Sequence, residues 1–369
     1  MRGRWTLLIA LACAGLWGAA ADADFYLHNT LDLSDSNYFD NPLFDNESPY
    51  GTNPSAVTTD GMNLWLAGFN GGTSTNSVAG IVKISDPWGT PIGAPVASFA
   101  STPGSRGFSG LAYDYNANVV LSAYDNGGAH PDGIAGWDPT ANTQMWGKNA
   151  RGGSGVGDDP GFGGVDMGAA WTTFGSGRRA LQNSATGADI YTTADGMIIA
   201  TSEGTFWRDM DFAPDGDIWL REGNNVIMAN RTGGNSVDAG VIIFDQDPDA
   251  DYVNGQNIAY LDQPGRGDLV IYNDRSSTAV GQPWSWVVQL IKPDGTPATE
   301  EFLDGLGAAL PFEFAIGSGY YDFEWYAPDE ILIVSDFSNR LVYQFRTFPI
   351  PEPASLLLLL AGVGLIRRR

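Results

Sequence analysis

The sequence contains almost no cysteine and almost no histidine. Among 369 residues there is one cysteine, Cys13, and there are two histidines, His28 and His130. Cys13 lies in an apolar stretch near the N-terminus, so the remainder of the chain has no disulfide, no thiolate chemistry and no cysteine metal site. A Ser-His-Asp triad would need one of the histidines, and no Gly-x-Ser-x-Gly turn joins a strand to a helix. These absences argue against triad hydrolysis and histidine-based zinc sites.

Basic residues are also scarce. The chain has 19 lysines and arginines against 43 aspartates and glutamates, a formal net charge of −24. Without the two terminal segments described next, 14 basic and 41 acidic residues remain, a net charge of −27. Such a surface repels nucleic-acid phosphates and anionic lipid, so we expect no nucleic-acid partner.

Long apolar runs are absent, and the two short ones lie at the ends. Residues 1–23 have the pattern of a secretory signal peptide, with Arg2 and Arg4 before an apolar stretch. Ala21 and Ala23 place small residues at positions −3 and −1 of a cut after Ala23. Cleavage after Ala21 is the alternative. The pattern predicts export, with signal peptidase as a partner.

The C-terminal run has a different pattern. Pro351-Glu352-Pro353 precedes an apolar stretch over Ala354–Ile366, and Arg367, Arg368 and Arg369 follow it. As a helix this stretch is roughly 20 Å long, against a hydrocarbon core of about 30 Å. The arginines should stay cytoplasmic. We therefore expect a short hydrophobic helix that halts export late and associates transiently with the membrane.

The order Pro-Glu-Pro, short leucine-rich helix and arginine cluster resembles the PEP-CTERM sorting signal. The resemblance covers residues 351–369 and says nothing about the rest of the chain. It implies that exosortase, an integral-membrane transpeptidase of Gram-negative bacteria that make extracellular polysaccharide, recognises Pro351, Glu352 and Pro353. It also implies removal of the helix with Arg367, Arg368 and Arg369. The expected location is the cell surface or its surroundings, after tethering by the C-terminal helix.

Between the two ends, the composition and an internal repeat indicate a β fold. The 48 glycines, 21 prolines, 12 tryptophans, 14 tyrosines and 18 phenylalanines suit short strands joined by tight turns. An apolar phrase recurs at intervals of 46 to 56 residues, a period typical of propeller blades. It aligns on Ile81, Ile134, Ile190, Ile242, Val288 and Val342.

A second phrase, strand–turn–strand, comes earlier in each unit. Asp-Gly and Pro-Asp-Gly turns between apolar strands predict hairpins, because glycine adopts positive φ without steric cost. The phrase covers Ala56–Leu66, Leu111–Leu121, Met210–Leu220, Ile258–Ile271 and Phe323–Val334, while Val165–Trp171 must serve as the inner strand of the third unit.

These repeats predict an all-β, six-bladed β-propeller over residues 24–348, between the signal peptide (1–23) and the sorting signal (349–369). We expect the tryptophans of the second phrase to pack between blades and the strand Phe25–His28 to close the ring beside Leu341–Phe345. Five or seven blades remain open, because the third unit and the stretch Ala298–Tyr320 are ambiguous.

One acidic run is a candidate metal site. Asp245, Asp247, Asp249 and Asp251 place oxygen ligands at alternate positions, which suits Ca²⁺. The run departs from an EF-hand loop, since alanine stands in place of the turn glycine. A solvated acidic turn is the alternative reading. Ca²⁺ is the only cofactor that the sequence suggests.

Two functions compete. The first is a non-catalytic surface or matrix propeller that binds extracellular polysaccharide or surface proteins. The second is a secreted Ca²⁺-dependent hydrolase or lactonase that acts in the propeller channel. Calcium-dependent lactonases of the gluconolactonase type share the expected fold, but no motif maps onto them residue by residue, so that link is one of fold alone. Side chains lining the channel would separate the two.

Overall fold

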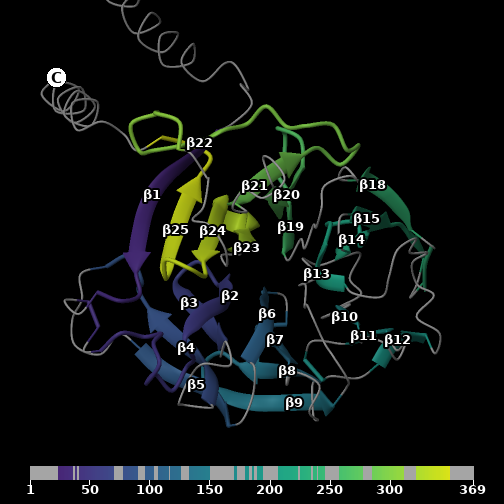
Figure 1. The fold of residues 1–369 in the computed structure, drawn as a ribbon. Coiled ribbons are helices and arrows are strands. Elements are labelled where there is room, and N and C mark those ends of the chain that lie inside the picture. Colours follow the sequence, from purple (N-terminus) through teal and green to yellow (C-terminus); the bar gives the residue numbers. More distant parts are fainter. Residues whose placement is uncertain are drawn as a thin grey trace, which may run out of the picture.

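The computed structural model is an all-β propeller in which antiparallel sheets stand around a central axis (Figure 1). The structure describes residues 24–35, 38–39, 41–69, 78–89, 96–103, 107–115, 117–125, 133–149, 170–172, 179–182, 185–186, 189–193, 207–222, 225–233, 236–238, 240–245, 257–276, 285–310 and 321–349.

The first part of the ring is one eight-stranded sheet made of two four-stranded units. One strand pair, Phe69 with Gly107, joins the units, and the Ser55 hydroxyl and the Lys83 ammonium donate to the Phe108 and Pro139 carbonyl oxygens across the same boundary. The first unit contains β2 (Asn53–Thr59), β3 (Asn63–Phe69), β4 (Val78–Ser85) and β5 (Val96–Pro103). The second contains β6 (Gly107–Asp114), β7 (Val119–Asp125), β8 (Gly133–Asp138) and β9 (Thr143–Asn149).

Four further sheets complete the ring. A three-stranded sheet contains β10 (Ala170–Thr172), β11 (Arg179–Gln182) and β12 (Asp189–Thr193). A four-stranded sheet contains β13 (Trp207–Phe212), β14 (Ile218–Glu222), β15 (Asn225–Ala229) and β18 (Val241–Asp245), with a side ribbon of β16 (Arg231–Gly233) and β17 (Ser236–Val237). A second three-stranded sheet contains β19 (Ile258–Leu261), β20 (Leu269–Ser276) and β21 (Ser285–Ile291). The last sheet contains β22 (Phe302–Leu303), β1 (Phe25–Asp32), β25 (Leu341–Arg346), β24 (Ile331–Asp336) and β23 (Tyr321–Tyr326), with the 3-10 turn η2 (Ala327–Asp329) between β23 and β24.

The number of blades depends on how the eight-stranded sheet is counted. Leaving the side ribbon apart, five hydrogen-bonded sheets surround the axis in the described part of the chain. The largest of these holds two of the repeating units found in the sequence. The strands β2, β6, β13, β19 and β23 lie towards the centre in Figure 1, and β5, β9, β12 and β18 lie at the rim.

Both sequence phrases fall on matching strands. The strand–turn–strand phrases form the hairpins β2–β3, β6–β7, β13–β14, β19–β20 and β23–β24. The aligned apolar residues lie on third strands, except Ile242, which lies on the fourth strand of its sheet. Gly61 and Gly216 have φ of 84° and 88°, as the predicted tight turns require. The predicted inner strand Val165–Trp171 is described only from residue 170 onwards.

The ring closes through the N-terminal strand, as the sequence predicted. β1 pairs antiparallel with β25, with Tyr26 opposite Arg346 and Asp32 opposite Leu341. On its other side β1 pairs in parallel with β22. The last blade is therefore assembled from both ends of the described chain, which covers the edge that β25 would otherwise expose.

Tryptophans fill the spaces between neighbouring sheets and between the two units of the eight-stranded sheet. Trp65 on β3 is fully buried and stacks on Tyr113 of β6, with ring centroids 5.7 Å apart. Trp219 on β14 meets Tyr260 of β19 at the same distance. The indole N–H of Trp325 donates to the carbonyl oxygen of Asp262, from the neighbouring β19–β20 loop. The predicted packing between blades is confirmed for Trp219 and Trp325, and Trp65 packs between the two units of the eight-stranded sheet.

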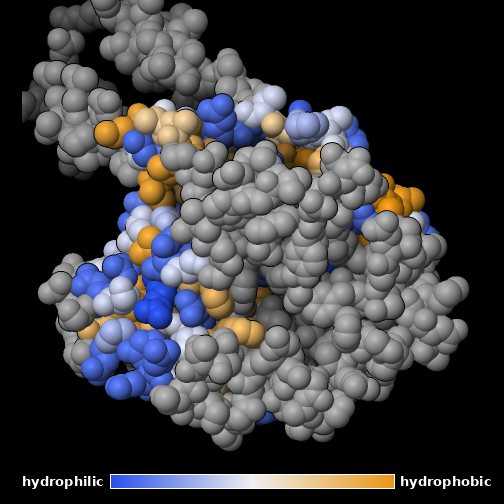
Figure 2. Space-filling model, in the orientation of Figure 1, coloured by the Kyte–Doolittle hydropathy of each residue, from blue (hydrophilic) through white to orange (hydrophobic). Residues whose placement is uncertain are grey.

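The two terminal segments and His130 lie outside the described residues. Within the part of the chain that is described, no helix is long and apolar enough to cross a membrane. Among the described residues visible in Figure 2, hydrophilic side chains gather at the lower left.

Replacing Trp65 with alanine should destabilise the protein strongly. The change removes a buried ring from the contact between two units, and we expect a loss of about 3–5 kcal/mol in the free energy of unfolding. Urea denaturation followed by tryptophan fluorescence and circular dichroism measures it. Met62→Ala, at the exposed tip of the same hairpin, is the matched control and should change the value by less than about 0.5 kcal/mol. Equal losses in both variants would contradict the assigned packing.

Candidate functional site

A pocket opens at the centre of the ring, between inner strands of different sheets. Its empty space, including the open mouth, is about 570 Å³. The described lining contains five carboxylic acids and no lysine, arginine or histidine. The lining residues are Leu111, Ala112, Tyr115, Asp209, Met210, Asp211, Phe212, Pro214, Ile258, Tyr260, Asp262, Asp322, Phe323, Glu324, Trp325 and Ala327.

Two of these acids connect β13 to β19. Asp209 and Asp211 are two residues apart on β13, so their side chains leave the same face of the strand. Asp209 Oδ2 accepts the backbone N–H of Ile258 at 3.0 Å, and Asp211 Oδ2 accepts that of Tyr260 at 2.7 Å. The two carboxylates, two residues apart on β13, therefore match two N–H groups that are two residues apart on β19.

Two others connect β23 to β2 in the same way. Asp322 Oδ2 accepts the backbone N–H of Val57 at 2.6 Å, while its Oδ1 accepts the side-chain amide of Asn257 at 2.6 Å. Glu324 accepts the hydroxyl of Thr58 at 2.8 Å. Because Asn257 directly precedes β19, Asp322 holds three sheets together at the axis.

The reason for these contacts lies in the geometry of an inner strand. In the described sheets, β2 pairs with β3 and β19 pairs with β20, each on one side only. Alternate N–H groups on the other side have no strand to bond, and leaving them buried without an acceptor would cost free energy. The carboxylates of the neighbouring sheet supply those acceptors.

Burial gives these acids unusual titration. It raises the pKa of Asp211 to about 7, although the N–H groups of Tyr260 and Phe212 lower it. It likewise raises the pKa of Asp322 to about 7, against the donors from Val57 and Asn257. The pKa of Asp209 is raised well above its usual value by burial and then by the charge of Asp322. At neutral pH the group therefore carries less than its full negative charge.

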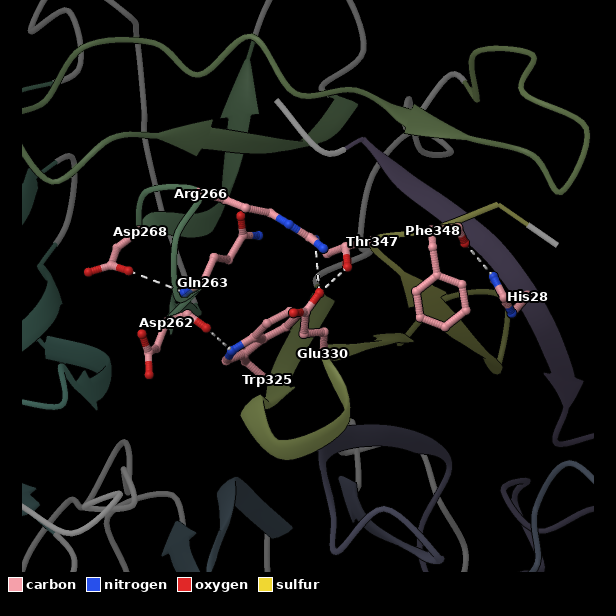
Figure 3. A network of polar contacts seen from close by, with 9 residues as sticks. All are labelled: His28, Asp262, Gln263, Arg266, Asp268, Trp325, Glu330, Thr347 and Phe348. Atoms are coloured by element: carbon pink, nitrogen blue, oxygen red, sulfur yellow. Dashed lines mark hydrogen bonds and ion pairs between the residues drawn. The ribbon is translucent and has the colours of Figure 1, made fainter. Parts of the chain in front are cut away.

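Asp262 differs from the four acids on the inner strands. It lies in the loop after β19, partly exposed, and its backbone rather than its carboxylate contacts Trp325. Figure 3 shows the carboxylate pointing away from the indole ring. Burial, followed by the charge of Asp268, raises its pKa. Asp268 accepts the Tyr260 hydroxyl at 2.6 Å and the Gln263 N–H at 3.2 Å, so it holds this loop against the pocket wall.

The predicted calcium run is described only at its first residue. Asp245 ends β18 at the rim of its sheet, and Asp247, Asp249 and Asp251 lie outside the described residues. Across the described ranges, no group of three or more histidine, cysteine, aspartate or glutamate side chains is arranged to hold a metal ion.

The axial acids were not singled out from the sequence, although a signal was present. Both pairs occupy alternate positions of an inner strand, as Asp-Met-Asp in β13 and Asp-Phe-Glu in β23. Acidic residues at alternate positions within a buried strand need partners, and that requirement could have marked them. Which partners they find depends on how neighbouring sheets are aligned in the ring, and the local sequence pattern does not give that alignment.

Comparisons with known proteins support the fold and go no further. No family model matches the chain, and no curated protein matches its sequence. Among solved structures, an auxiliary nutrient binding protein from Bacteroides thetaiotaomicron is 12% identical, with a TM-score of 0.51 over 86% of this chain and 75% of that one. The β-propeller domain of Myceliophteria thermophila Cps50 (Swd1) is 9% identical, with a TM-score of 0.44 over 79% and 82%. The hydrazine synthase of Kuenenia stuttgartiensis is 13% identical, with a TM-score of 0.48 over 76% and 73%.

The raised pKa values predict that part of the stability is lost between about pH 4 and pH 7. Asp211 and Asp322 keep their protons up to about pH 7 when folded but lose them near pH 4 when unfolded. The folded state is therefore favoured below pH 4, and this advantage falls as the pH rises to 7. Urea denaturation midpoints measured across this pH range give the slope of stability against pH.

The variant Asp322→Asn should have a smaller slope over that range, because one of the titrating groups is gone. It should also be less stable throughout, since an amide has a single acceptor oxygen for two donors. Asp294→Asn is the matched control: that carboxylate is exposed and hydrogen bonds lower its pKa, so its contribution falls below about pH 4. An unchanged slope in Asp322→Asn would refute the titration assigned to the axis.

Proposed function

We propose that the chain is an exported cell-surface or matrix β-propeller with a non-catalytic binding or structural role. The observation that carries this proposal is that the axial acids hold neighbouring sheets together. Asp209, Asp211, Asp322 and Glu324 all accept hydrogen bonds from neighbouring inner strands. Groups committed to holding sheets together are poorly placed to move protons for a substrate or to coordinate a metal ion.

The ring counts as six blades in this proposal. The two four-stranded halves of the eight-stranded sheet each begin with an inner hairpin, and their strand pairing is limited to Phe69 with Gly107. Each half therefore has the organisation of a separate blade.

The character of the ligand follows from the charge of the pocket and the surface. A chain with a net charge of −24, and a pocket lined by acids without a described basic residue, disfavour anionic ligands. Aromatic side chains such as Tyr260 and Trp325 offer flat apolar surface beside carboxylates, a combination that suits neutral or positively charged groups. Extracellular polysaccharide or a surface protein is the partner class that we propose.

The export part of the proposal rests on the two terminal segments. Signal peptidase would remove residues 1–23 and exosortase would act at Pro351-Glu352-Pro353, releasing the helix and its arginines. The destination would be the surface of a Gram-negative bacterium, after tethering by the C-terminal helix.

The sorting signal can be tested in a Gram-negative host that makes exosortase. Intact mass of the exported protein should show loss of the residues after the Pro-Glu-Pro motif. A variant with Pro351→Ala, Glu352→Ala and Pro353→Ala should keep the tail and stay with the membrane fraction. Pro349→Ala, two residues before the motif, is the matched control and should be processed normally. If both variants lose the tail equally, the motif is not what the processing enzyme reads.

The alternative function, a Ca²⁺-dependent hydrolase or lactonase, is favoured by one observation. Asp, Glu and Asn side chains do converge at the axis, and raised pKa values are common among catalytic acids. A calcium titration separates the two proposals.

We expect the unfolding temperature of the exported protein to be the same in millimolar Ca²⁺ and in chelator, and no calcium-dependent turnover of lactones or glycosides. A rise that Asp247→Asn abolishes would locate a calcium site in the 245–251 run. Turnover abolished by Asp211→Asn would overturn the non-catalytic proposal.

A further inference from the structure

The axial pocket leads from exposed residues at its mouth to buried acids at its bottom. Pro214 is exposed and Asp262 and Ala327 are half-buried, so these residues mark the mouth. Asp209 and Asp322 are only 7% and 4% exposed, so they mark the bottom. A ligand that reaches these acids from solvent must therefore extend a narrow group into the ring.

Most of the wall around the acids is apolar. Its apolar side chains come from four inner strands, β6, β13, β19 and β23, so the pocket belongs to the ring and not to one sheet. Each of the following is at most 5% exposed: Leu111, Met210, Phe212, Ile258 and Phe323. The group that enters must present apolar surface to this wall.

The side chains of the lining that can donate hydrogen bonds are few, and two of the three are already engaged. The Tyr260 hydroxyl donates to Asp268 at 2.6 Å, and the Trp325 indole N–H donates to the carbonyl oxygen of Asp262 at 2.9 Å. The third donor is the hydroxyl of Tyr115, which can equally accept. The described lining therefore offers little to a ligand that needs donors.

Acceptors, in contrast, remain available. An ionised carboxylate has about four lone-pair sites. Asp211 accepts the N–H groups of Tyr260 and Phe212, at 2.7 and 2.8 Å, which leaves lone pairs for a further donor. In the described part of the chain, no hydrogen bond or ion pair reaches the carboxylate of Asp262, which Figure 3 shows turned away from the indole ring. The acids can thus accept from a ligand without leaving the strands that they hold.

We infer that the axial pocket holds the side chain of a lysine from a protein partner, with its ammonium group at the acids and its four-carbon stem along the apolar wall. The inference rests on the proposed binding role and names the ligand for it. An ammonium group has three donors and no acceptor, so it complements a lining that is rich in acceptors. Its stem packs on apolar surface while its charged end reaches polar groups.

Other ligand groups match the same lining less well. Every hydroxyl group of a sugar carries lone pairs that need donors, and two of the three described side-chain donors are engaged. The guanidinium of arginine is a rigid planar fork, whereas an ammonium group is compact and can follow a narrow path. The observations therefore favour a protein partner over a polysaccharide.

The electrostatics of the axis support a cationic ligand. Burial, and then the charge of Asp322, raise the pKa of Asp209, and Asp268 adds to the raised pKa of Asp262. The titratable groups of the described lining are five acids and two tyrosines, and none of them is basic. A cation among the acids favours their ionised form, so binding should release protons at pH 6, where the acids are partly protonated. The affinity should consequently be higher at pH 8 than at pH 6.

The probe is a capped pentapeptide, Gly-Gly-Lys-Gly-Gly, titrated by calorimetry into the full chain purified in detergent. The matched peptide carries norleucine, which keeps the four-carbon stem and lacks the ammonium group. We expect the lysine peptide to bind at least about tenfold more tightly than the norleucine peptide at pH 8. Titrations at pH 6 in two buffers of different ionisation enthalpy should show proton release with the lysine peptide alone.

Variants of the pocket test where the ammonium group lies. Asp211→Asn and Asp262→Asn should each weaken binding of the lysine peptide at least about fivefold and leave the norleucine peptide unchanged. Asp294→Asn, an exposed acid outside the pocket lining, is the matched control and should leave both unchanged, which excludes a general attraction to the acidic surface. If Asp211→Asn fails to fold, Asp262→Asn still decides, because no described contact depends on that carboxylate.

Equal affinity for the two peptides, or an equal loss in Asp294→Asn, would overturn the inference. Tighter binding of a glucosamine trisaccharide than of the lysine peptide would also overturn it; the pocket would then belong to a polysaccharide, and the proposed binding role would stand. Mass spectrometry of the recovered peptide tests that role separately. A peptide that is bound through Asp262 and chemically altered would keep the lysine site and overturn the non-catalytic proposal.

Discussion

The unpaired edges of the innermost strands are the constraint on which this propeller depends. In the described part of the chain, the inner strands β2, β13, β19 and β23 each have a neighbouring strand on one side only. In this chain the missing acceptors are side-chain carboxylates from the next sheet, as between Asp211 and Tyr260. The sheets are thus joined by packed apolar faces and also by hydrogen bonds that cross from one sheet to the next.

This arrangement places acidic groups where water is largely excluded, which has an electrostatic cost. Asp209 and Asp322 lie close enough for the charge of one to raise the pKa of the other. Protonation relieves the repulsion, and each carboxyl keeps acceptor oxygens for its N–H partners in either state. An axis of this kind combines structural order with a charge that depends on pH.

The fold could be predicted largely from the sequence, because each blade repeats the same local pattern. Turns such as Asp60-Gly61 and Asp215-Gly216 mark the inner hairpins, and the apolar phrase at Ile81 and its relatives marks later strands. Closure by β1 was also predictable, since an isolated strand-like segment needs an edge to pair with.

The axial site could not be predicted in the same way. Whether Asp322 meets Val57 depends on residues 265 positions apart being brought together by closure of the ring. The sequence pattern predicted a metal site in the Asp245–Asp251 run instead. The spacing of ligands along the chain is visible in a sequence, whereas the convergence of side chains from different blades is not. Ile242 is a second example: it aligns in sequence with residues of third strands, but it lies on the fourth strand of its sheet.

The closing strand has a consequence for association between molecules. β1 reaches its place by pairing with β25 and β22, which are distant in sequence, and nothing covalent ties it there. An identical strand from a second molecule presents the same hydrogen bonds and the same buried phenylalanine. At high protein concentration, exchange of β1 between copies would link propellers into dimers or chains without any new interface.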